Sequence, residues 1–191
     1  MADLGRCIFD KSLKNNSTVK VGILNDNKWV GYNPTLLIHN NPNIDIAVLR
    51  LNTNDLKKNL FDIGNKNYYL SQDCYFLGFP FGLKMEDSKM KINNGFPIPF
   101  VKKGIISSFI TDSNNVTQIF IDGHNNPGFS GGPVVVENID KSEYKMRIIG
   151  VVSAYLNQEQ TINTPFGSFK SNENSGIVLS YGISHIYEII N

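Results

Sequence analysis

The sequence is poor in the residues that build metal centres and disulfide frameworks. Its 191 residues include two cysteines, three histidines and one tryptophan. The histidines and cysteines show no spacing typical of a zinc site, so we expect no bound metal and no cofactor. Cys7 and Cys74 suggest no disulfide framework, and we expect them to be buried small side chains or free thiols.

Net charge and long apolar runs are also scarce. The 18 Lys and Arg residues nearly balance 17 Asp and Glu residues, leaving a formal net charge of +1. This balance provides no basic field for nucleic acid. The apolar runs are far shorter than the roughly 20 residues of a membrane span, and no signal segment opens the chain. We therefore expect neither a nucleic-acid nor a membrane partner.

Short apolar, β-branched runs separated by turn residues dominate the chain. Turn signals such as Asn41-Pro42-Asn43 lie between them, a pattern typical of an all-β sandwich or barrel. The expected strands are Val19 to Leu24, Trp29 to Tyr32, Leu36 to Ile38, Ile44 to Leu51, Cys74 to Leu77, Ile105 to Ile110, Gln118 to Ile121, Pro133 to Val136, Met146 to Val152 and Gly176 to Leu179.

Three segments depart from this strand pattern. The C-terminal end carries an apolar stripe at helical spacing, and His185 falls opposite this stripe, which predicts an exposed side chain. The polar stretch from Leu83 to Lys103 predicts a connector between two β subdomains. The stretch from Asn157 to Ser175 predicts a long exposed loop or hairpin. The helical stripe consists of Ile183, Ile186, Tyr187 and Ile190.

The sharpest chemical signal is the run Gly128-Phe129-Ser130-Gly131-Gly132-Pro133. A serine hydroxyl becomes a nucleophile when a base removes its proton and backbone N–H groups hold the oxyanion. Glycines beside the serine let those N–H groups point at one spot. The run also fits the nucleophile elbow of α/β-hydrolases, but that elbow needs a strand before the serine and a helix after it. Here a proline and three valines follow, which predicts a strand instead.

Gly-x-Ser-Gly-Gly-Pro before an apolar strand resembles the nucleophile motif of trypsin-like serine peptidases. Further segments resemble the family in the same order, with HtrA-like members the most similar. These segments are the aspartate strand at Asn43 to Leu49, the G-x-P-x-G strand end at Phe76 to Gly82, the strand at Lys103 to Ser107 that opens the second barrel, and the strand at Ile149 to Ser153 that lines the specificity pocket.

The resemblance implies an all-β, two-barrel chymotrypsin-like fold with a short C-terminal helix. It divides the chain into an N-terminal barrel at residues 1–85 and a C-terminal barrel at residues 86–191. It makes Ser130 the nucleophile and Asp45 the residue that orients a catalytic histidine, with the N–H groups of Gly128 and Ser130 as the oxyanion hole. A peptide or protein substrate would lie along Val152, Ser153 and Ala154.

The histidine that this mechanism needs has no convincing counterpart. His39 lies only six residues before Asp45, in the strand-to-turn segment that leads into it. We therefore expect a partly exposed turn histidine there. His124 lies six residues before Ser130, where the family places the floor of its specificity pocket. It predicts either a preference for acidic side chains or a loop histidine bonded to backbone.

The first barrel of the family has six strands, and two of them precede the catalytic histidine. About four are found here before the connector, so we expect an incomplete N-terminal barrel in a chain that begins too late to include the histidine. Two other functions stay open. One is a pseudopeptidase that binds an extended peptide without cleaving it. The other is an esterase that uses Ser130 and His185, which requires a helix after the serine.

Overall fold

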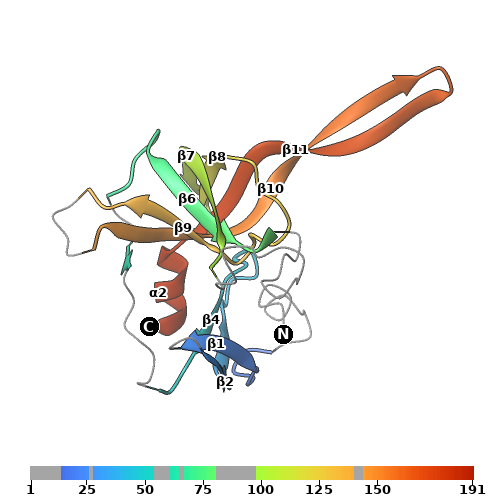
Figure 1. Cartoon of the computed structure of the whole chain (residues 1–191). Helices are drawn as coiled ribbons and strands as arrows, with labels where there is room; N and C mark the ends of the chain where they lie inside the picture. Colours follow the sequence, from blue (N-terminus) through green and yellow to red (C-terminus); the bar gives the residue numbers. More distant parts are fainter. Residues whose placement is uncertain (1–13, 26–27, 54–60, 65–66, 81–97, 140–143) are drawn as a thin grey trace.

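The computed structural model describes residues 14–25, 28–53, 61–64, 67–80, 98–139 and 144–191. β-Strands dominate this part of the chain, and one short helix, α2 (Ser184–Ile190), follows the last strand (Figure 1). No helix in these ranges is long and apolar enough to cross a membrane. The all-β fold expected from the sequence is confirmed.

Six strands of the second half close into a barrel. They are hydrogen-bonded in the order β11-β8-β7-β6-β9-β10, and β10 pairs back with β11 to complete the ring. Closure leaves these barrel segments without unpaired edges. The strands are β6 (Asp73–Gly78), β7 (Phe100–Thr111), β8 (Thr117–Asp122), β9 (Pro133–Glu137), β10 (Met146–Thr164) and β11 (Gly167–Gly182).

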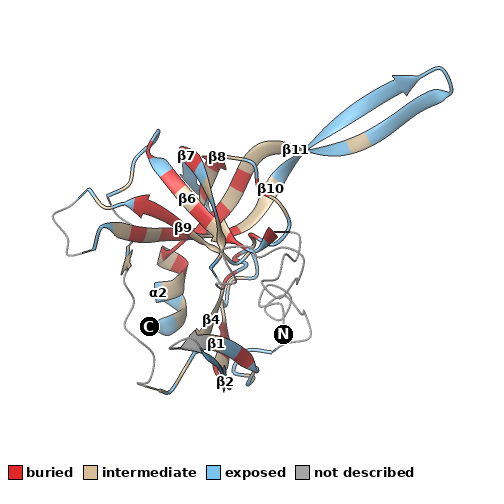
Figure 2. Cartoon of the chain, viewed as in Figure 1, coloured by how far each residue is buried: buried red, intermediate tan, exposed pale blue. Residues whose placement is uncertain are grey.

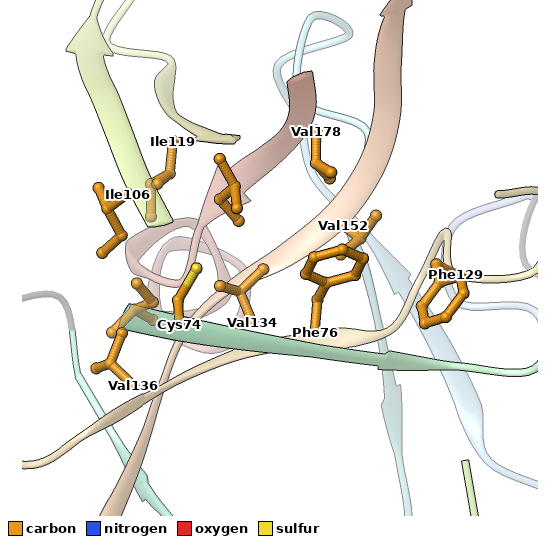
Figure 3. Packing of buried hydrophobic residues seen from close by; sticks show 11 residues of the cluster. Cys74, Phe76, Ile106, Ile119, Phe129, Val134, Val136, Val152 and Val178 are labelled. Carbon is orange, nitrogen blue, oxygen red and sulfur yellow. The ribbon is translucent and has the colours of Figure 1, made fainter. Parts of the chain in front are cut away.

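The barrel encloses the main hydrophobic core, shown in Figure 3. Alternate side chains of β6 point inward, so Cys74 and Phe76 are fully buried. Phe76 meets the loop residue Phe129 edge to face, with ring centroids 5.4 Å apart. Burial raises the pKa of the Cys74 thiol to about 12, which fits the expected inert, buried cysteine. The core therefore anchors the serine-bearing loop directly.

The first part of the chain forms two small hairpins. β1 (Val21–Asn25) pairs with β2 (Lys28–Tyr32), and β3 (Thr35–Ile38) pairs with β4 (Ala47–Arg50). An isolated bridge between Thr18 and Thr35 joins the segment before β1 to β3. Four strands are thus described here, beneath the barrel in Figure 1.

All ten expected strands are present, but their grouping differs from the sequence expectation. β6 pairs with β7 and β9, so the barrel opens with β6 and not with the strand at Lys103 to Ser107. The connector predicted at Leu83 to Lys103 lies between β6 and β7, which are neighbours in one barrel. Its last residues already belong to β7, which begins at Phe100, and residues 81–97 lie outside the described ranges. The division into units at residues 1–85 and 86–191 stays a prediction, and β6 pairs with strands on the C-terminal side of it.

A two-residue strand that the sequence does not reveal, β5 (Asp62–Ile63), pairs in parallel with β10. The buried Arg147 of β10 donates to the Asp62 Oδ2 atom from Nε at 2.8 Å, and its Nη2 lies 2.7 Å from the same oxygen. The hydrogen bond from Arg147 is the main reason why the pKa of Asp62 is lowered. This charge pair joins β5 to the barrel.

Candidate functional site

Ser130 lies in the loop between β8 and β9, directly beside β10. Its side chain is half-buried, and its Oγ donates a hydrogen bond to the carbonyl oxygen of Ser153 at 2.9 Å. The loop is joined to the same strand through Val152, whose N–H donates to Gly132 O at 2.9 Å. The structure therefore places Ser130 next to β10, the strand along which the sequence predicts that substrate binds.

The serine loop comprises residues 123–132, and the backbone N–H groups of its last five residues, Gly128 to Gly132, fall into two classes. Three of them donate to carbonyls of the barrel or the loop, whereas those of Gly128 and Ser130 donate to no acceptor in the described part of the chain. The two unpaired N–H groups are the pair expected to form an oxyanion hole. The paired donors are Phe129 to Asn126 at 3.3 Å, Gly131 to Val152 at 2.7 Å and Gly132 to Phe129 at 2.9 Å.

The end of β6 shapes the loop from the other side. Phe79 N–H donates to Gly128 O at 2.9 Å. Gly128 has φ +103°, and a Cβ on it would lie 2.1 Å from Phe79 O. A Cβ on Gly78 would lie 2.6 Å from the Phe129 Cα. Gly78 and Phe79 thus support the serine loop, and only glycine permits the close approach at positions 78 and 128.

Lys102 of β7 braces the loop and was missed by sequence reasoning, because a lone lysine in a strand carries no motif. Its Nζ donates to His124 O at 2.6 Å and to the Asn126 side chain. It also lies 5.3 Å from the Phe129 ring centroid. Desolvation lowers the pKa of Lys102. The His124 side chain itself is exposed, so its proposed part in choosing acidic substrates stays a prediction.

Asparagines link the serine loop to β10 and β11. Buried Asn125 donates from Nδ2 to Ala154 O at 3.5 Å, and Asn174 donates to Asn125 O at 2.6 Å. The predicted substrate residue Ala154 therefore lies next to the loop, as Ser153 does. The sequence offered no sign of the two asparagines, because asparagine is common throughout this chain.

Asp45 is not joined to Ser130 by any contact in the described residues. Its side chain is exposed, and its carboxylate makes no hydrogen bond or ion pair within the described part of the chain. Desolvation raises its pKa. Its predicted role as the carboxylate that orients a histidine is therefore unfilled in this structure.

None of the three histidines is bonded to Ser130, and all three lie within the described ranges. His124 is exposed, while His39 and His185 both bond to Glu188 of α2. The esterase hypothesis also fails, because the strand β9 and no helix follows Ser130.

His39, His185 and Glu188 form a clamp between the C-terminal helix and the first part of the chain. The Glu188 Oε2 atom lies 2.9 Å from His39 Nε2 and 3.1 Å from His185 Nδ1. His185 is fully buried, so its expected exposure is wrong. The helix α2 also contacts the barrel, because Thr117 N–H of β8 donates to His185 Nε2 at 2.9 Å.

This clamp has the residue types of a metal centre, but its ring nitrogens are all engaged in hydrogen bonds within the chain. The three ligand atoms lie within 4.8 Å of one another. However, His39 Nδ1 accepts from Asn41 N–H at 3.0 Å, and His185 Nε2 accepts from Thr117 N–H. Each neutral ring must then carry its proton on the nitrogen that faces Glu188. A metal needs a lone pair there, so these residues do not fit a metal ion.

We expect Glu188→Gln to lower the melting temperature at pH 7 by about 2–4 °C. Desolvation raises the pKa of Glu188, but hydrogen bonds from His185 and His39 outweigh it and the pKa is lowered overall. A lowered folded-state pKa gives stability that is present above the ordinary value of 4.5 and is lost as the pH falls.

The difference in melting temperature between the unmodified chain and Glu188→Gln should therefore shrink towards pH 3. Thermal unfolding followed by circular dichroism measures it. Glu173→Gln, on an exposed strand residue, is the matched control and should leave the melting temperature unchanged. A constant difference from pH 7 to pH 3 would argue against the clamp.

The sequence matches the trypsin-like peptidase domain family over residues 8–139, which includes Ser130. No curated protein matches it. Among 17 matching solved chains is one described as the HtrA-type protease AlgW, in a variant form with a decapeptide, at 20% identity and a TM-score of 0.54. The alignment covers 90% of this chain and 42% of that one, so this chain spans less than half of its structural relative.

The all-β fold agrees with the family match, and the matched residues include the Gly-x-Ser-Gly-Gly-Pro loop. The closed six-stranded barrel supports the serine loop from inside, and the C-terminal helix follows the last strand. The structural relative supports the same chymotrypsin-like fold. The chain therefore belongs to the trypsin-like peptidase domain family.

Proposed function

We propose that the serine loop and β10 form a peptide-binding site of the serine endopeptidase type, with Ser130 as the nucleophile. The observation that supports this most is the pair of unpaired N–H groups at Gly128 and Ser130, next to a hydroxyl on the same loop. A peptide carbonyl that binds these two donors lies within reach of Oγ. Attack would form an ester bond between Oγ and the peptide carbonyl carbon, the acyl-enzyme, and break the C–N bond, with the hydroxyl proton passing through solvent water to the released amine.

Within the described residues, no basic side chain is bonded to the Ser130 hydroxyl to receive its proton. Oγ donates to the Ser153 carbonyl, which is no base at neutral pH and can only hold the hydroxyl in place. The histidines that could accept a proton are exposed or bonded to Glu188. We therefore infer that this chain cleaves peptides slowly, because the Asp45 carboxylate has no imidazole to orient.

Binding without rapid cleavage is the second candidate, and it rests on the same cleft. The AlgW structure contains a decapeptide, and here Ser153 and Ala154 continue a strand whose partner β9 ends at Pro133. An extended peptide can add to such an edge through backbone hydrogen bonds. Preference for acidic side chains near His124 and the Lys102 ammonium stays part of this proposal.

A serine-directed fluorophosphonate tests the proposed nucleophile. We expect slow modification that peptide mapping by mass spectrometry assigns to Ser130 and to no other serine, because its hydroxyl shares a loop with the unpaired N–H groups of Gly128 and Ser130. The Ser130→Ala protein should stay unmodified over the same time. Modification spread evenly over several serines would show that the loop does not activate Ser130.

A further inference from the structure

Strands β10 and β11 continue far beyond the barrel as a two-stranded arm. The arm comprises residues 157–174, and its pairing runs from Asn157 with Asn174 to Thr164 with Gly167. Figure 1 shows it leaving the body of the molecule, and Figure 2 shows that it is exposed over nearly its whole length. The sequence predicted a loop or hairpin here, and the hairpin is confirmed. An ordered hairpin this far from the core gains no stability from core packing.

The base of the arm lies at the candidate nucleophile. The pairing of β9 with β10 ends at Val151, and the loop contacts of Val152 follow. The next carbonyl along β10, that of Ser153, accepts the Ser130 hydroxyl. Asn174 at the base of the arm also bonds to the serine loop through Asn125 O. One side of β10 thus runs as an edge from Ser130 to the tip of the arm, with two irregularities in its pairing with β11 near the base. At that base the Ala154 carbonyl accepts from Asn125 Nδ2.

This edge has few of the features that usually protect an exposed strand. Its pairing with β11 is irregular only near the base, between Val152 and Ala154 and between Tyr155 and Asn157, and Glu159 forms an ion pair with Lys170. Between Tyr155 and Thr164 the sequence contains no Lys, Arg or Pro, and Glu159 is its one charged residue. Alternate residues of a strand turn their N–H and C=O groups away from the partner strand, here β11. In the described part of the chain no strand pairs with that side of residues 155–164. Natural proteins block such edges with lysine, proline or cover, because they readily accept another strand.

We propose that the β10 edge from Ser153 to Thr164 binds an extended, unfolded polypeptide as an added antiparallel strand. This inference rests on the proposed function, because the polypeptide is the part of the substrate that precedes the bond facing Ser130. An antiparallel strand that starts at Ser153 runs with its N-terminal side toward the tip of the arm. At about 3.4 Å per residue, roughly ten substrate residues fit along it.

The tip adds apolar contacts to the backbone pairing. Ile162 and Phe169 face each other across the two strands and are 47% and 57% exposed, and Phe166 in the turn is 95% exposed. Such side chains on an exposed hairpin indicate a contact surface. The favoured substrate is therefore a long unfolded chain with an apolar residue roughly ten positions before the bond at Ser130.

Hydrogen exchange of the full chain carrying Ser130→Ala tests this proposal. The probe is reduced, carboxymethylated α-lactalbumin, a permanently unfolded polypeptide, and native α-lactalbumin is the folded control. We expect the unfolded form to slow exchange of outward-facing amides in residues 155–164 by about tenfold or more. Amides of residues 168–174 on β11 should be unaffected, and the native form should protect neither strand.

An arm-shortened variant, in which residues 158–173 are replaced by Asn-Gly, supplies the second measurement. Its Kd for the unfolded probe should rise by about tenfold, while its melting temperature stays close to that of the parent, because the deleted residues contact no core. Unchanged affinity would overturn the proposal.

The remaining outcomes separate this inference from the proposed function. Protection of the serine loop and residues 153–155 without protection beyond them would refute the arm and keep the peptide site. Protection at neither place would refute both. Concentration-dependent protection of the arm without the probe, together with a dimer in sedimentation velocity, would show that a second copy occupies the edge, and this also overturns the proposal.

Discussion

Gly132→Ala is expected to destabilise the chain by more than about 4 kcal/mol, enough to prevent folding of an ordinary domain. A Cβ at this position would lie 1.8 Å from the Leu77 carbonyl oxygen and 2.9 Å from that of Phe129. Both atoms are backbone, so no side-chain rotation relieves the clash. The same residue accepts the Val152 N–H, so a shift of Gly132 also breaks the contact with β10.

Gly31→Ala is the matched control, because a Cβ there meets no atom within 4 Å. Its free energy of unfolding should change by less than about 1 kcal/mol. Gly131→Ala tests the local backbone separately: its Cβ is also unobstructed, but φ is +84°, which costs an alanine roughly 1–2 kcal/mol. Urea denaturation of the three variants measures the differences. Equal free energies for Gly132→Ala and Gly31→Ala would show that β6 does not press on the serine loop as described.

Peptide hydrolysis by the unmodified chain is expected to be about 10⁴ to 10⁶ times slower than by a peptidase with a complete triad. The cause is the position of the histidines. His39 and His185 have both ring nitrogens hydrogen-bonded in the clamp. His124 precedes Ser130 in the serine loop, and its side chain is exposed. On our proposal the N–H groups of Gly128 and Ser130 stabilise an oxyanion, so we expect some acceleration over water to persist.

The release of amines from reduced, carboxymethylated α-lactalbumin at pH 8 measures this rate. Triad members act as a unit, so removing the serine from a site that already lacks its base should cost little more. We therefore expect Ser130→Ala to lower the rate by less than about tenfold. A rate for the unmodified chain a thousand times that of Ser130→Ala would mean that a functioning base serves Ser130.

Strands were predictable from this sequence where β-branched residues alternate between turn signals. β9 and β6 are examples, because Val134 and Phe76 point into a core that needs such side chains. β5 was missed because two residues carry no periodicity, and it depends on the charge pair of Asp62 with Arg147. His185 was misjudged because an apolar stripe describes one face of an isolated helix, whereas α2 packs against two parts of the chain.

Only the part of the candidate site that lies within the Gly-x-Ser-Gly-Gly-Pro motif was predictable from the sequence. The glycines beside Ser130 indicated a loop with exposed N–H groups, and the structure leaves two of them unpaired. The support from Phe79 and Lys102 comes from strands far away in the sequence, and no local pattern encodes it. The extent of the arm was predicted, but its sequence did not decide between a loop and a hairpin, because a segment rich in Asn, Gln and Ser has weak β-propensity.

The pH dependence of Ser130 modification tests the central claim most directly, namely that the serine loop is formed but has no histidine base. The rate of fluorophosphonate labelling at Ser130 would be measured from pH 5.5 to pH 9 in the full chain. Without a base, we predict a rate that rises about tenfold per pH unit with hydroxide and shows no plateau. A rate that levels off above roughly pH 7, as a titrating imidazole requires, would contradict the account.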